Sequence, residues 1–114
     1  MALKENHGSL VREQLLAQNQ EINVVTDKLT IPQGTKLLTR GTLVTSGGVA
    51  VGEGGEPYGV IAADVDATEG EKEAVVYLTG EFNIAAVKAG EGVDVATLKV
   101  AARKVGIFLK EIMN

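Results

Sequence analysis

Short runs rich in Thr, Val and Leu, interrupted by Gly and Pro at close intervals, most limit what this chain can fold into. They begin with "INVVTDKLTI", continue past a turn at residues 32–34 into "TKLLTRGTLVT", and resume as "GVAVGEGGEPYGVIAADV" and "EAVVYLTGEF". Runs of this length and composition between turn-forming residues are typical of short β-strands. In the last run we expect alternating residues to lie on opposite sides: Val76, Leu78 and Phe82 against Val75, Tyr77 and Thr79.

The apolar spacing changes to that of a helix only near the end of the chain, at Val95, Leu98, Ala101, Ala102 and Val105. Asp94 is suited to cap the first turn, and Gly106 to end the helix. "IFLKEI" then returns to strand character. The sequence therefore predicts a small, mainly β domain with one C-terminal helix, whose residues Leu98, Ala102 and Val105 pack on the sheet.

Length and composition limit the classes of protein to which the chain can belong. Its 114 residues fit one domain. Hydrophobic residues make up 45% of the chain, yet it has only two Phe, two Tyr and no Trp, so we expect an aliphatic core. The net charge of −4 predicts no nucleic-acid partner. Neither a signal-peptide core nor a run of about 20 apolar residues is found, so no membrane partner is expected.

The first 20 residues differ from the rest, because they are polar and poor in Gly and β-branched residues. Their only apolar cluster consists of Leu10, Val11, Leu15 and Leu16. Isolated segments this short form marginal helices. We interpret residues 1–20 as an arm whose order depends on a partner, with a frayed terminus as the alternative, and residues 21–114 as the β-rich domain. Removing residues 1–20 is expected to spare the fold.

Residues 64–68, "DVDAT", match the DxDxT pattern of phosphatases of the haloacid dehalogenase type. That site needs a parallel α/β sheet and later strands that supply more carboxylates and Lys, but only 46 residues follow Thr68. An EF-hand starting at Asp64 would need Gly and Glu where Glu69 and Val75 stand. We interpret Asp66 and Thr68 as starting a turn in which Gly70 has a positive φ.

Other candidate sites are incomplete. His7 is the only histidine, and it has no Cys or second His with which to bind a metal. Neither Ser9 nor Ser46 lies in a G-x-S-x-G pattern. The Gly-rich stretch at residues 52–59 lacks the Lys and Ser/Thr of a phosphate-binding loop. The basic residues Lys99, Arg103 and Lys104 fit a solvated helical face. We therefore predict no enzyme, and no catalytic, cofactor or metal site.

The ordered series "IPQGTKLLTRGTLV", "PYGVIAADVDAT", "VVYLTGEFN" and "GIFLKEI" resembles the phage head decoration proteins, the lambda-type capsid cement family. The resemblance covers roughly residues 30–112. It implies a β-clip-like domain, preceded by an extended arm, that binds the major capsid protein. It also implies homotrimers on the outer face of an icosahedral head, which stabilise the shell after expansion, with the protein in the host cytoplasm before assembly.

In that role, "EINVV" could add a strand to a capsid sheet, with main-chain hydrogen bonds giving affinity and Ile22, Val24 or Val25 filling pockets. The expected capsid-contact residues are Leu10, Val11, Leu15, Leu16, Ile22, Val24 and Val25. The alternative for this stretch is pairing within its own sheet. The alternative function is a small β-barrel module that binds a peptide or metabolite beside the Gly-rich stretch, and a phosphatase is a remote third.

Overall fold

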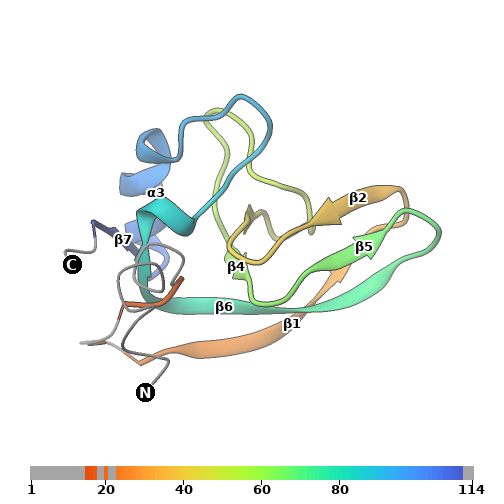
Figure 1. Cartoon of the computed structure of the whole chain (residues 1–114), viewed down its shortest axis with the longest axis horizontal. Coiled ribbons are helices and arrows are strands. Elements are labelled where there is room, and N and C mark those ends of the chain that lie inside the picture. The colour runs from red at the N-terminus through yellow and green to blue at the C-terminus, as the bar shows by residue number, and fades with distance from the viewer. Residues whose placement is uncertain (1–14, 18–19, 21–22, 112–114) are drawn as a thin grey trace, which may run out of the picture.

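The computed structural model describes residues 15–17, 20 and 23–111, and this part of the chain is mainly β-structure with one short helix (Figure 1). The elements in chain order are β1 (Val25–Ile31), β2 (Thr35–Leu38), β3 (Leu43–Val44), β4 (Gly59–Ile61), β5 (Val65–Ala67), β6 (Lys72–Asn83), the 3-10 helices η1 (Ile84–Ala86) and η2 (Val95–Leu98), α3 (Lys99–Lys104) and β7 (Ile107–Lys110). The predicted fold class, mainly β with one C-terminal helix, is confirmed. The β-clip-like or barrel-like geometry stays a prediction.

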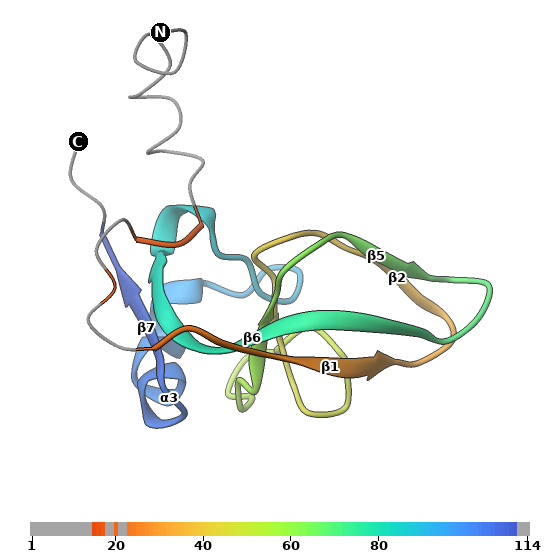
Figure 2. The same ribbon diagram turned by 90° about the horizontal axis from the view of Figure 1, so that it is seen from below.

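Strand β6 connects the two ends of the molecule. It pairs antiparallel with all of β1 along one edge, and with β4 along the other, where β3 extends the sheet. Its last four residues pair in parallel with β7. Strands β2 and β5 form a separate two-stranded sheet. Figures 1 and 2 show α3 and β7 at one end of β6, and β2 with β5 towards the other.

The core has two parts, one towards each end of β6. The α3–β7 core consists of Leu15, Leu43, Val51, Val60, Phe82, Val87, Leu98, Ala102, Ile107 and Leu109. The β2–β5 core consists of Ile31, Leu38, Val44, Ile61, Ala67, Ala74 and Val76. Phe82 is the one aromatic residue among these buried side chains, so the predicted aliphatic character is confirmed.

The alternation predicted for β6 holds only in its first part. Val76 is buried and Val75 is 45% exposed. Phe82, expected on the side of Val76, packs instead in the other core, with its ring centroid 5.6 Å from that of Tyr77. All four residues 80–83 are buried. The alternation therefore ends at Gly80, where β7 and the N-terminal residues begin to pack against the strand.

The predicted helix begins as 3-10 and ends earlier than expected. The Asp94 carboxylate accepts a hydrogen bond of 3.0 Å from Ala96 N, so the predicted cap is confirmed. Leu98 and Ala102 are buried as predicted, but Val105 is 45% exposed. Val105 was wrongly placed, because the α-helix already stops at Lys104. Gly106 follows with φ +90°, a conformation that glycine adopts without steric cost.

Candidate functional site

Residues 15–17 lie along the last part of β6 and are bonded to it through the main chain. The contacts are an isolated antiparallel bridge between Leu16 and Phe82, a hydrogen bond of 2.7 Å from Asn83 N to Leu15 O, and one of 2.9 Å from Ala17 N to Glu81 O. β7 pairs with residues 80–83 of β6, which include these three. Two segments from opposite ends of the sequence therefore meet at residues 80–83.

The side chain of Leu15 lies inside the domain. It is 1% exposed and belongs to the α3–β7 core. Burying a Leu side chain contributes roughly 1.5–3 kcal/mol relative to leaving it exposed. The expectation that residues 1–20 can be removed without harm to the fold does not fit this burial, because the cut would take a core side chain with it.

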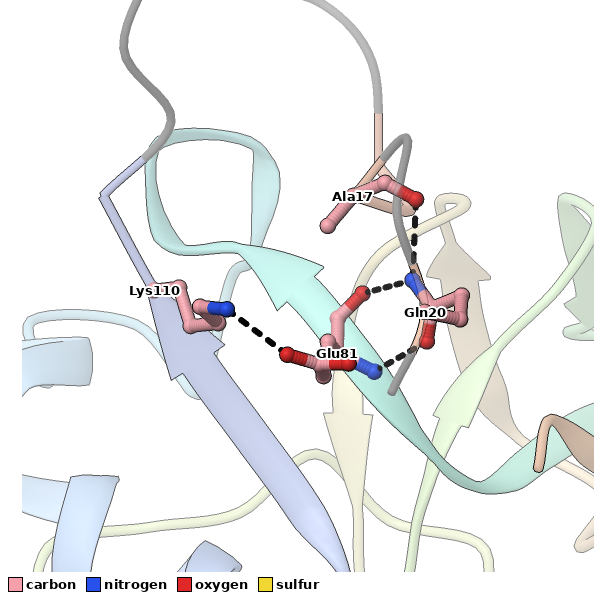
Figure 3. A network of polar contacts seen from close by, with 4 residues as sticks. All are labelled: Ala17, Gln20, Glu81 and Lys110. Carbon is pink, nitrogen blue, oxygen red and sulfur yellow. Dashed lines mark hydrogen bonds and ion pairs between the residues drawn. The ribbon is translucent and has the colours of Figure 1, made fainter. Parts of the chain in front are cut away.

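Gln20 fixes the N-terminal residues to β6 with its side-chain amide, as Figure 3 shows. Its Nε2 donates to Glu81 O at 2.7 Å and to Ala17 O at 2.9 Å, while its Oε1 accepts from Glu81 N at 2.7 Å. The amide thus bonds both main-chain groups of Glu81, as the backbone of a neighbouring strand would. Both of its N–H donors are used. Gln20 therefore extends the pairing of residues 15–17 with a side chain.

Glu81 also joins the N-terminal residues to the last strand. Its carboxylate is 6% exposed and accepts a hydrogen bond of 2.7 Å from Lys110 Nζ, whose own side chain is 44% exposed (Figure 3). A buried carboxylate without such a partner would lose its hydration uncompensated. Charge-assisted bonds of this length are stronger than neutral ones. Glu81 is therefore held by its main chain on one side and by its side chain on the other.

The structure divides the seven expected capsid-contact residues. Leu10, Val11 and Ile22 lie outside the described residues. Leu15 is buried and Leu16 is partly buried. Val24 and Val25 are 37% and 45% exposed, so both present apolar surface.

The start of β1 pairs within the protein's own sheet. Val25 is in register with Thr79 on β6, and the Thr79 hydroxyl donates to Asn23 O at 2.6 Å. Among the described strands, β1 pairs with β6 alone, so its outer edge has no strand beside it. The alternative considered for "EINVV" therefore holds for Val25, while the outer edge of β1 remains open to strand addition.

The DxDxT residues build turns. Arg40 N donates to the Asp64 carboxylate at 2.7 Å, which ties two loops together. The Asp66 carboxylate accepts from Thr68 N at 2.9 Å and from the Thr68 hydroxyl at 2.5 Å. The hydroxyl bond first, and then the main-chain bond, lower the pKa of Asp66. The predicted turn at Asp66 and Thr68 is confirmed, but Gly70 does not have the positive φ expected of it. Its N–H bonds instead to Ala67 O at 3.3 Å, which closes the turn.

Two other findings concern metal binding and membrane crossing by the described residues. Within residues 15–17, 20 and 23–111, no three His, Asp or Glu side chains are grouped so as to hold a metal ion. In the same part of the chain, no helix is long and apolar enough to cross a membrane.

The sequence-based reading missed Gln20, Glu81 and Lys110 as one group. Glu81 did offer a signal, because it stands between Gly80 and Phe82 in a run that otherwise reads as buried strand. The partner could not be read from the sequence, since the Gln20 and Glu81 that bond each other are 61 positions apart.

Comparison with known proteins gives one positive result. The family model described as bacteriophage lambda head decoration protein D matches residues 7–106. The match includes every strand and helix of the fold except β7, which begins at the next residue, Ile107. No curated protein sequence matches the chain significantly.

Proposed function

Because the chain belongs to the family of bacteriophage lambda head decoration protein D, we propose that it binds the outer surface of an icosahedral phage head as trimers and stabilises the expanded capsid. The family match over residues 7–106 is the observation that carries this proposal. The family is structural, and its members belong to the phage head. The partners are then the major capsid protein and two further copies of the chain, on the outer face of the virion, with the host cytoplasm as the site before assembly.

The arm is proposed to contribute part of the affinity for the capsid. Residues 1–14 precede the attachment of Leu15 to the domain core, and they include Leu10 and Val11. Fourteen extended residues reach about 50 Å at most. A segment of that length can cover a wide surface and add main-chain hydrogen bonds at a strand edge. Leu15 contributes indirectly, because its buried side chain anchors the arm to the domain.

A second contact is proposed at the start of β1. Val24 and Val25 are exposed, and the outer edge of β1 has no strand beside it among the described strands. Ile22 and the partly buried Leu16 lie near them in sequence and complete the set of contact residues. A capsid strand paired along β1 would cover these apolar side chains and bond the open edge.

The direct test uses expanded heads that lack their decoration protein. The purified chain is mixed with these heads, and co-sedimentation is measured together with the temperature at which the heads break open. We expect saturable binding and a higher breakage temperature, and analytical ultracentrifugation should give the mass of free and bound oligomers. Heads that neither bind the chain nor gain stability would contradict the proposal.

The alternative function is a module that binds a peptide or metabolite. A hollow of about 360 Å³ lies beside the Gly-rich stretch and is lined by Ser46, Glu56, Pro57, Tyr58, Ala101, Lys104 and Val105. Its volume is at the lower limit for small-molecule sites. A small molecule that co-purifies with the chain, and that is lost on Tyr58→Ala, would favour this function.

A further inference from the structure

The face of the α3–β7 end that carries Glu81 is hollowed, and it carries cations. The hollow has a volume of about 830 Å³ and is lined by Glu81, Lys99, Arg103, Phe108, Leu109, Lys110 and Glu111. Phe108 is in register with Glu81 on the neighbouring strand, and Lys110 follows two residues later. Alternate residues of a strand share a face, so Phe108 and Lys110 lie on the same face of β7.

Two cations of the hollow lack a partner in the described part of the chain. Lys110 is paired with Glu81, but no ion pair joins Lys99 or Arg103 to any described carboxylate. Lys99 and Arg103 are four residues apart on α3, so they are neighbours on the helix surface, and both are exposed. Glu111 is the one acid of the lining that Lys110 does not neutralise. The hollow is therefore locally cationic in a chain whose net charge is −4.

This combination differs from a purely solvated basic face, because an aromatic side chain lies beside the cations. Phe108 is only partly buried, although β7 is otherwise a core strand at Ile107 and Leu109. Aromatic and Arg side chains are the residues most enriched at protein interfaces. A guanidinium binds a carboxylate through two parallel hydrogen bonds. The chemistry of the hollow thus fits a segment that presents a carboxylate next to an apolar side chain.

The hollow also adjoins the place where the arm enters the domain. The main chain of Glu81 is bonded by Gln20 and Ala17, and the same residue lines the hollow. A partner that contacts the arm where it joins the domain can therefore also contact the adjoining hollow. We propose that this hollow is a second docking site for the capsid, occupied by an acidic segment of the major capsid protein. The inference rests on the proposed function and adds a contact to it.

The test compares two charge-reversed variants of the full chain on expanded, undecorated heads. The first carries Lys99→Glu with Arg103→Glu. The matched control carries Lys36→Glu with Lys104→Glu, which changes the net charge equally at two exposed cations outside the hollow. We expect the hollow variant to need at least about tenfold more protein to saturate the heads, and the control less than about twofold more, with equal melting temperatures. Raising the salt concentration should weaken wild-type binding more than that of the hollow variant.

Other outcomes would overturn the inference. Equal losses for both variants would mean that only net charge matters, and no loss for either would mean that the hollow does not touch the capsid. Dissociation of free oligomers by the hollow variant alone would identify a second copy as the occupant. The hollow variant could instead melt at a lower temperature than the wild type in the full chain but not in chains that end at Glu111. That result would identify residues 112–114 of the same chain as the occupant of the hollow. If the wild-type chain itself fails to bind heads, that result contradicts the proposed function, and this inference is then wrong as well.

Discussion

The two ends of the molecule are built by different means, although one strand, β6, runs through both. At the β2–β5 end, the polar side-chain contacts lie at the surface: the hydrogen bonds of Asp66 with Thr68 form a local turn, and the ion pair of 3.9 Å between Lys28 and Glu73 is exposed. At the α3–β7 end, segments far apart in sequence meet around a buried carboxylate. The comparison teaches that the two kinds of end should respond differently to the same kind of substitution.

Removal of N-terminal residues should have the largest effect, and the position of the cut decides it. A chain that starts at Leu15 should keep the melting temperature of the full chain. A chain that starts at Glu21 loses Leu15, at about 2–5 kcal/mol, and the hydrogen bonds of Leu15, Ala17 and Gln20 with β6, at roughly 0.5–1.5 kcal/mol each. Urea unfolding of the two truncated chains measures the difference. Equal stabilities would show that residues 15–20 contribute nothing to the α3–β7 end.

The helix offers the next test within the same end. Leu98 is 2% exposed in the α3–β7 core, so Leu98→Ala should lower the free energy of unfolding by about 2–5 kcal/mol. Val105 is 45% exposed, and Val105→Ala should change it by less than about 0.5 kcal/mol. Thermal unfolding followed by circular dichroism separates the two. Similar losses of unfolding free energy for the two variants would indicate that Val105 is buried in the core after all.

Matched substitutions on β6 compare the two ion pairs. Glu81→Gln removes the charge of a carboxylate that is 6% exposed, and should cost about 1–3 kcal/mol. Glu73→Gln does the same at a side chain that is 66% exposed, where an ion pair contributes at most about 1 kcal/mol. Chemical denaturation of both variants gives the comparison. A loss at Glu73 as large as that at Glu81 would remove the proposed contrast between the ends.

The smallest effect is expected at Asp66, and it depends on pH. The hydrogen bonds from Thr68 lower the pKa of Asp66 in the folded state, so the carboxylate stabilises the fold above the pKa of the unfolded state. That contribution is lost as the pH falls through the lower, folded-state value, below about pH 4. The difference in melting temperature between wild type and Asp66→Ala should therefore shrink on acidification, while Asp66→Asn, which can still accept a bond, changes less. A difference that is constant from pH 7 to pH 3 would contradict this.

Distance along the chain explains what could be predicted from the sequence. The turn at Asp66, the cap at Asp94 and the stop at Gly106 each depend on residues a few positions apart, and all three were predicted correctly. Leu15 was assigned to the arm because its neighbours in sequence are polar, and its place in the core depends on Phe82 and Leu98, which come much later. Val105 was misplaced because the helical spacing does not show that the α-helix ends one residue earlier, at Lys104. The pairing of Gln20 with Glu81 had no local pattern at all.

The position of Glu81 between the first described residues and the last strand has a consequence for the order of folding. The β1–β6 pair and the two-stranded β2–β5 sheet can form as soon as residue 83 is available, since none of their strands extends beyond it. The α3–β7 end cannot close until residue 110 has been made, because Lys110 is the cation that bonds the Glu81 carboxylate. In a nascent chain, the β2–β5 end should therefore become ordered first, while the end that anchors the arm forms only after the last strand has been made.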